Sequence, residues 1–189
     1  MHILPTMMLG TLSLHWMNNF KYLGINISVK GTVDIDCTTI KRKFYSSCNS
    51  ILQRLGSVSE IVCLQLAKSS CLPMLTYCID ALILSKQALQ QLCICWNDAY
   101  RKVFHYKRYE SERIFLQYIC GDLPFDYMYD ILRWSFYSRM MDRNKYLDCL
   151  FALDTTFKNH IIDKYHPVNL SNYSVKNAVW LYFEHSLCF

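Results

Sequence analysis

The sequence predicts a mainly α-helical fold, in which a helical bundle is preceded by a small antiparallel β-hairpin. Hydrophobic residues make up 52% of the 189 positions while Gly and Pro number only 5 and 4, and so few helix breakers favour long helices. Apolar and polar residues alternate over residues 11–16, with the period of two that is typical of a strand. We therefore expect a β-hairpin over residues 1–33, a helical region over 34–152 and a C-terminal helical extension over 153–189.

The pattern of residues 1–33 predicts short extended segments joined by turns. Residues 6–9 and 11–16 form two such segments, and the turn signal at Asn18 and Asn19 leads into a strand from Phe20 to Val29. Gly24 interrupts this strand, and a glycine inside a strand pattern indicates a bulge or a close backbone approach. We expect a hairpin or three-stranded sheet whose open edges need a partner, because an isolated hairpin is only marginally stable in water.

The first helix is predicted to follow a helix entry at residues 34–36. Asp36 or Thr38 is its expected N-cap, and Gly56 its expected end. One stripe of apolar residues recurs along it at helical spacing: Ile40, Phe44, Cys48, Ile51, Leu52 and Leu55. Its first turns also carry Lys41, Arg42 and Lys43, three cations that oppose the helix dipole unless an anion lies nearby.

Three further helices are predicted before residue 105. Ser57 or Ser59 caps the first, which the Pro73 ring breaks or kinks, and residues 74–84 resume as the second. Ser85 caps the third. Its apolar residues share one face: Leu89, Leu92, Trp96, Tyr100, Val103 and Phe104.

The last part of the chain predicts four more helices, over residues 111–120, 127–150, 155–164 and 175–187. Gly121 ends the first of them, Pro167 breaks the chain after the third, and residues 169–174 are predicted to be a loop.

Ten cysteines raise the question of disulfides or a metal site, and their spacing argues against both. The sequence contains no Cys-x-x-Cys pair, and no His follows a cysteine pair at zinc-knuckle spacing. Most cysteines occupy apolar positions of helical patterns, as Cys48 does beside Phe44 and Ile51, and a free cysteine behaves as a small hydrophobe. We expect reduced core thiols in an intracellular protein of the cytoplasm or nucleus.

Two apolar stretches are weak candidates for targeting or membrane segments. Residues 1–16 lack the basic start of a secretory signal. Residues 61–84 form the longest apolar stretch, but Lys68, Pro73 and Asp80 interrupt it. We therefore interpret this second stretch as core helices and do not expect a membrane-spanning protein.

One segment carries a family signature, and three others follow it in the expected order. Residues 19–27 read aromatic-Lys-Tyr-Leu-Gly followed by aliphatic residues, and residues 71–77 contain Leu-Pro, an aliphatic pair and Tyr. Residues 89–104 contain Trp-Asn and end in Arg-Lys-Val-Phe, and Leu-Pro-Phe follows a glycine at 123–125. Over roughly residues 19–140 the chain resembles the region after the palm in reverse transcriptases of non-LTR retrotransposons, where a primer-grip β-hairpin precedes a helical thumb.

The resemblance implies where this chain would meet nucleic acid. Tyr22, Leu23 and Gly24 would lie near the primer terminus, with the glycine allowing close backbone approach. The basic residues would form the phosphate-contacting face of the thumb: Lys41, Arg42, Lys43, Arg101 and Lys102. The alternatives are an ordinary strand with a bulge and a solvated basic surface. The net charge of +5 permits phosphate contact without requiring it.

The chain departs from this family at the catalytic centre. The family's polymerases need an aromatic-x-Asp-Asp loop and a third carboxylate, which together hold two Mg²⁺ ions. This sequence has no adjacent Asp-Asp, and Asp34-Ile35-Asp36 is better explained as a turn and helix cap. We interpret the chain as a truncated relative without palm or fingers, and expect no catalytic residue, no cofactor or metal, no small-molecule ligand and no polymerase activity by itself. Its expected partners are an RNA or DNA duplex and the missing palm and fingers domains.

Two other functions remain open from the sequence. A helical protein-interaction module, or a membrane-associated one that uses residues 61–84, would need no nucleic acid. Tyrosines interleave with cations as in a single-strand stacking platform, but their spacing suits helix packing equally well and we favour packing: Tyr100, Tyr106, Tyr109 and Tyr118.

Overall fold

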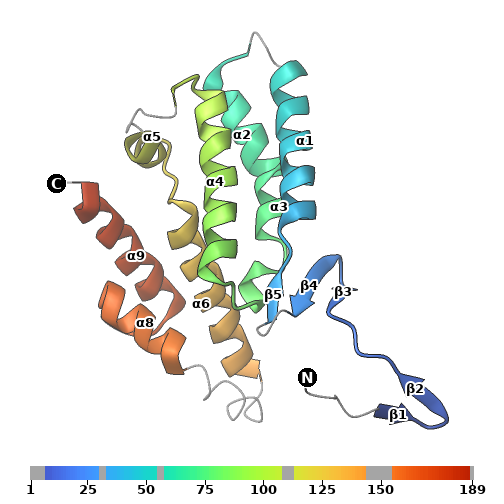
Figure 1. Ribbon diagram of the computed structural model, residues 1–189. Helices are drawn as coiled ribbons and strands as arrows, with labels where there is room; N and C mark the ends of the chain where they lie inside the picture. Colours follow the sequence, from blue (N-terminus) through green and yellow to red (C-terminus); the bar gives the residue numbers. More distant parts are fainter. Residues whose placement is uncertain (1–6, 30–32, 55–57, 108–112, 144–154, 188–189) are drawn as a thin grey trace.

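The computed structural model describes residues 7–29, 33–54, 58–107, 113–143 and 155–187. Strands β1 (Met7–Leu9) and β2 (Leu12–Leu14) pair antiparallel as a separate hairpin. Strands β3 (Asn19–Tyr22), β4 (Ile25–Val29) and β5 (Val33–Ile35) form an antiparallel sheet in the order β3-β4-β5. Figure 1 shows the β1–β2 hairpin projecting away from the helices, with the sheet between it and the bundle.

Helices make up the rest of the described chain: α1 (Thr38–Arg54), α2 (Glu60–Ser70), α3 (Leu72–Thr76), the 3₁₀ turn η1 (Ile79–Ala81), α4 (Lys86–Val103), α5 (Arg113–Ile119), α6 (Phe125–Arg143), α8 (Thr155–Tyr165) and α9 (Asn172–Leu187). Helices α1 to α4 stand side by side, α6 packs against α4 and η1, α9 lies along α6, and α8 packs against α9 (Figure 1). The predicted fold class, mainly helical with a small preceding hairpin, is confirmed.

The interpretation of residues 20–29 as one bulged strand is wrong. The backbone reverses at Leu23 and Gly24, both of which have positive φ, 46° and 85°. Two consecutive left-handed residues are the signature of a two-residue type I′ hairpin turn, whose twist matches that of the flanking strands. Tyr22 pairs directly with Ile25 across this turn. The glycine therefore marks a turn between two strands rather than a bulge within one.

The predicted helix entry at residues 34–36 is also displaced. Val33–Ile35 is a strand, because its pairing with β4 places Ile35 opposite Ile27 and against the helical core. Asp36 does serve the helix start, since its Oδ1 accepts the Thr38 backbone N–H at 2.9 Å. Thr38 is the first helical residue instead of the cap.

The continuous helix predicted over residues 74–84 does not form. Helix α3 ends at Thr76, Cys78 takes a left-handed φ of 57°, and the chain continues through η1 into an extended segment. Packing decides this outcome, because the Tyr129 hydroxyl of α6 donates to the Leu82 carbonyl and accepts the Leu84 N–H. Distant contacts therefore override the local helical pattern.

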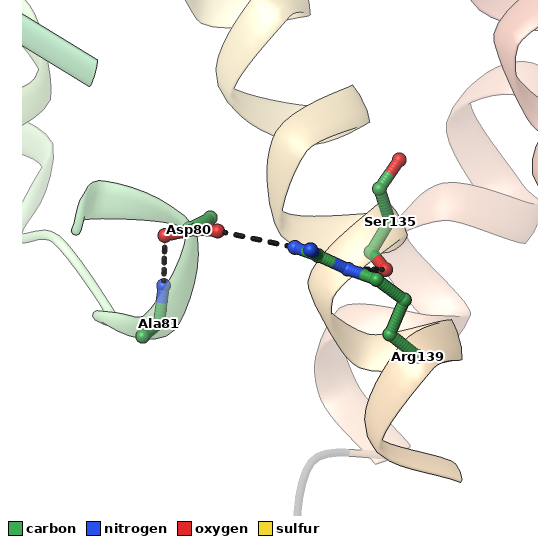
Figure 2. A network of polar contacts seen from close by, with 4 residues as sticks. All are labelled: Asp80, Ala81, Ser135 and Arg139. Carbon is green, nitrogen blue, oxygen red and sulfur yellow. Dashed lines mark hydrogen bonds and ion pairs between the residues drawn. The ribbon is translucent and has the colours of Figure 1, made fainter. Parts of the chain in front are cut away.

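A polar contact also joins η1 to α6. Figure 2 shows the Asp80 carboxylate accepting the Ala81 N–H at 3.1 Å and meeting the Arg139 guanidinium at 3.5 Å. The Arg139 Nε also donates to the Ser135 carbonyl. Because Arg139 is largely exposed, this ion pair contributes little stability by itself.

Other local predictions are confirmed, and some lie outside the described residues. Ser85 Oγ accepts the Ala88 N–H at the start of α4, and Gly121, with a φ of 66°, follows the end of α5. Helix α9 begins at Asn172, three residues before its predicted start, because Ser171 Oγ accepts the Ser174 N–H. The following residues of the predicted elements lie outside the described part of the chain: Leu55, Gly56, Ser57, Tyr109, 111–112 and 144–150.

Two hydrophobic cores hold the helices. The first lies among α1 to α4 and the start of α6, and its largest fully buried side chains are Trp96, Tyr100 and Phe44. It also encloses the cysteines that the sequence assigned to the core: Cys37, Cys48, Cys63, Cys71 and Cys95. The second core joins α6 to α8 and α9 around Trp134, Ile161 and Phe183.

Among the described residues, one stretch is long and apolar enough to cross a membrane. It spans 60–81, and an 18-residue window within it has a mean hydropathy of 1.2 and is 28% buried. The structure divides this stretch into α2, α3 and η1.

Candidate nucleic-acid interface

Residues 19–27 and 71–77, on which the predicted resemblance rests, lie close together in the structure. A Cβ added to Gly24, at the tip of the β3–β4 hairpin, would lie 3.9 Å from Cε1 of Tyr77, which follows α3. At the same tip, Tyr22 and Leu23 are 63% and 66% exposed. The hairpin tip therefore rests beside α3 and presents two apolar side chains to solvent.

Hydrogen bonds tie this hairpin to the first turn of α1. The Asn26 carbonyl accepts the Asp36 N–H at 2.9 Å, and the Asn26 side-chain amide donates to Thr39 Oγ1 at 3.1 Å. Lys41 lies two residues beyond Thr39 on the same helix. The predicted primer-grip segment and the first predicted cations therefore belong to one connected unit.

A line of polar contacts runs between α1 and α4, which we name the α1–α4 seam. Lys41 Nζ donates to Gln91 Oε1 at 3.0 Å, at the N-terminal end of α1. Further along, the Tyr45 hydroxyl donates to Asp98 Oδ2 at 2.8 Å, and Lys102 Nζ to Asn49 Oδ1 at 2.7 Å. Residues four or seven apart lie on one helix face, which is why these members align: Lys41, Tyr45 and Asn49 on α1, and Gln91, Asp98 and Lys102 on α4.

The remaining predicted cations lie at or near this seam. Arg101 pairs with Asp98 at 3.0 Å, and Lys102 Nζ lies 5.2 Å from the centre of the Tyr45 ring. Arg42 is exposed and falls on the same helix line as Asn49, seven residues on, whereas Lys43 is exposed about 100° further around the helix. The seam thus collects more positive than negative charge: Lys41, Arg42, Arg101 and Lys102 against Asp98.

The unfavourable interaction of three cations with the dipole at the start of α1 is offset by a carboxylate of the chain itself. The first turn of α1 holds no acidic residue, but Asp36 places its carboxylate directly before the helix, on the Thr38 N–H. A carboxylate at this position is favoured by the helix dipole. An external phosphate is therefore not required to stabilise the first turn.

The Tyr45 hydroxyl of the seam and three thiols of the first core have raised pKa values. Burial raises the pKa of the Tyr45 hydroxyl, with a further contribution from its hydrogen bond to Asp98, so the hydroxyl remains a neutral donor. Burial also raises the pKa of the Cys48 and Cys95 thiols, and that of Cys71 to about 11. A nucleophilic cysteine needs a lowered pKa and access to solvent, so these three thiols are core side chains.

The sequence indicated the cations of the seam, but it did not indicate their hydrogen-bond and ion-pair partners. Tyr45, Asn49, Gln91 and Asp98 are ordinary helix residues in sequence. The spacing of Tyr45 and Asn49, four and eight residues after Lys41, was a usable signal. Their partners on α4 could not be found in this way, because they depend on how the two helices pack.

The described part of the chain offers no cluster of three or more His, Cys, Asp or Glu side chains placed to hold a metal ion. Neither the known protein-family models, nor the curated proteins, nor the solved structures contain a match to this chain.

Proposed function

We propose that this chain is a non-catalytic module that contacts an RNA or DNA duplex through its phosphates, resembling the primer-grip and thumb portion of a retrotransposon reverse transcriptase. The observation that carries the proposal is the α1–α4 seam, which gathers cations from residues 41–42 and 101–102 onto two packed helices. The contact between the hairpin tip and Tyr77 supports it, because it joins two segments that resemble the family.

The internal partners of these cations are compatible with phosphate binding. Lys41 and Lys102 donate to the neutral amides of Gln91 and Asn49, and a phosphate oxygen is a stronger, charge-assisted acceptor than an amide. Arg42 and Lys43 are exposed and reach solvent directly. Contacts of this kind position a duplex without reading its sequence.

Chain extension is outside this proposal. The Mg²⁺-binding carboxylates of the parent family have no counterpart motif in this sequence. Palm and fingers domains would have to supply them, and those domains are the partners that the resemblance implies.

Fluorescence anisotropy with a labelled 16-base-pair RNA–DNA duplex, repeated at rising NaCl, tests the proposal. The double variant Arg42→Gln/Lys43→Gln removes two exposed cations of the predicted phosphate-contacting face, Arg42 at the seam and Lys43 further around α1. The control Lys86→Gln/Lys176→Gln removes two exposed cations elsewhere. We expect the first variant to lower the slope of log affinity against log salt by about 2, because each phosphate contact contributes roughly 0.9. The second variant should leave the slope unchanged.

Binding that is absent, independent of salt, or weakened equally by the two double variants would refute the proposal. The variants share the same change in net charge, so only the position of the charges distinguishes them.

A second candidate function is a protein-interaction module. It is favoured by the large apolar side chains that the N-terminal strands expose, since soluble domains rarely leave such groups uncovered in one region. A membrane-associated variant would instead use residues 60–81 and would make the purified protein dependent on detergent.

A further inference from the structure

The N-terminal strands and their connections expose a dense set of large apolar side chains. We name this set the N-terminal apolar surface, and its members are each at least 45% exposed: Met7, Met8, Leu12, Trp16, Met17, Phe20, Tyr22 and Leu23. Apolar patches of this kind mark interaction sites more often than ordinary surface. Strand β3 carries two members of this set, Phe20 and Tyr22, and its backbone shows what kind of partner would fit.

Strand β3 has a free hydrogen-bonding edge. Tyr22 and Ile25 flank the two-residue turn and form a hydrogen-bonded pair, and so do Phe20 and Ile27 two residues away. The backbone groups of Asn19 and Lys21 therefore point away from β4. Within the described residues no strand pairs with that side, and Figure 1 shows β3 at the outer edge of the sheet. Such an edge is a template for another extended chain.

The side chains of β3 define what that chain should carry. Phe20 and Tyr22 lie on one face, whereas Asn19 and Lys21 lie on the other. Asn19, Phe20 and Lys21 all line a hollow of about 630 Å³ along the strand. Directly opposed side chains stabilise a sheet when both are apolar or when their charges are opposite. A fitting strand thus places apolar residues opposite Phe20 and Tyr22 and a carboxylate opposite Lys21.

Charge complementarity favours a different polypeptide over a second copy of this chain. Residues 1–33 contain two lysines and no Asp or Glu, so another copy of β3 would bring no carboxylate to Lys21. Asp36 lines the same hollow, but its Oδ1 already accepts the Thr38 N–H.

We propose that the free edge of β3 binds an extended segment of a partner protein in which an acidic residue lies between two apolar ones. The segment would add a strand to the sheet through the backbone of Asn19 and Lys21 and cover part of the N-terminal apolar surface. This inference does not depend on nucleic-acid binding, which uses the α1–α4 seam.

The test uses the full chain, labelled with ¹⁵N, and two capped peptides at low salt. The first peptide is Thr-Val-Glu-Val-Thr, and the control peptide replaces its Glu with Lys. We expect the Glu peptide to shift the amide resonances of Asn19 and Lys21 and to bind roughly three- to tenfold more tightly than the Lys peptide. Lys21→Glu should reverse this preference, whereas Lys86→Glu, at an exposed site on α4, should preserve it.

A second variant tests the backbone pairing separately. Lys21→Pro removes an N–H that points away from β4, so the β3–β4 pairing is kept while the outer edge loses a donor. We expect it to abolish binding of both peptides. If the amide spectrum shows that this variant disturbs the sheet, the proposal is judged by the peptide preference of Lys21→Glu alone.

Three outcomes would overturn the proposal. The first is equal binding of the two peptides, or no shift at Asn19 and Lys21. The second is a concentration-dependent dimer in sedimentation that Lys21→Pro disrupts, which would assign the edge to a second copy. The third is binding of the N-terminal apolar surface to anionic lipid vesicles without any response to either peptide.

Discussion

The N-terminal strands and the helical part of this protein are both rich in apolar residues, yet they use them in opposite ways. Of the described side chains between Met7 and Val29, Ile25 alone is buried. The helices, by contrast, enclose two cores built around Trp96 and Ile161. The helical part therefore holds itself together by packing, whereas the strands depend on backbone pairing and one tight turn.

The apolar content of a segment therefore does not predict whether that segment belongs to a hydrophobic core. Composition alone makes residues 7–29 as good a candidate for a core as α4. What separates them is whether other elements cover both sides of the segment.

Two tryptophans measure the contrast directly. Trp96 is 0% exposed and its Nε1 has no hydrogen-bond partner among the described residues, whereas Trp16 is 56% exposed. Trp96→Ala should lower the free energy of unfolding by about 3–5 kcal/mol through lost packing. Trp16→Ala should change it by less than about 0.5 kcal/mol. Urea denaturation followed by circular dichroism measures both, and similar losses would contradict the contrast.

A buried carboxylate on α6 joins this helix to α8 by hydrogen bonds in the second core. Asp130 of α6 accepts the Tyr165 hydroxyl at 2.6 Å and Lys164 Nζ at 3.2 Å, both from α8. Asp130→Asn should lower the free energy of unfolding by about 1–3 kcal/mol, because it removes the charge from both hydrogen bonds. Hydrogen exchange in α8 should accelerate. Asp163→Asn, at an exposed site on α8, is the matched control and should have little effect.

The same site predicts a loss of stability in alkali. Burial, together with the nearby Asp130 carboxylate, raises the pKa of Tyr165 above the ordinary value of 10.0. Its stabilising contribution is complete below that value and is lost as the pH rises towards the folded-state pKa. Above pH 10 the free energy of unfolding should fall by about 1.4 kcal/mol per pH unit for this group. Urea denaturation at several alkaline pH values should show a smaller slope for Tyr165→Phe.

Two serines precede helices, but only one of them makes a capping hydrogen bond. Ser85 Oγ accepts the Ala88 N–H, whereas Ser59 precedes α2 without a side-chain capping bond. Ser85→Ala should cost about 1 kcal/mol of stability. Ser59→Ala should cost less than about 0.5 kcal/mol. Thermal denaturation of the two variants side by side checks the difference, and equal losses would show that the capping bond has no special role.

The smallest effect is expected in the hairpin turn, where stabilisation is possible. Leu23 holds a left-handed φ of 46°, which is unfavourable for a branched aliphatic residue and natural for Asn. Leu23→Asn should stabilise the β3–β4 hairpin by up to about 1 kcal/mol and slow exchange of the Ile25 amide, which pairs with Tyr22. Gly24→Ala should do the opposite, because Gly24 has a φ of 85°. Faster exchange in Leu23→Asn would contradict this account of the turn.

Within the candidate interface, the sequence indicates the cations but not the groups that they contact. It singled out Lys41, Arg101 and Lys102, and the structure brings these three to the α1–α4 seam. It did not predict that Asp36 would offset the charge at the start of α1. The cations themselves are visible in a sequence, whereas the partner that each one meets depends on the packing of other elements.

The sequence by itself determined where most helices form, because capping, helical periodicity and the scarcity of Gly and Pro act within a few residues of one another. The secondary structure of residues 74–84 and 33–35 depends instead on tertiary contacts. Tyr129 holds residues 82–84 extended, and β4 draws Ile35 into a strand. In both cases the deciding hydrogen bonds come from distant elements, and their combined free energy exceeds the small differences in local propensity that a sequence pattern records.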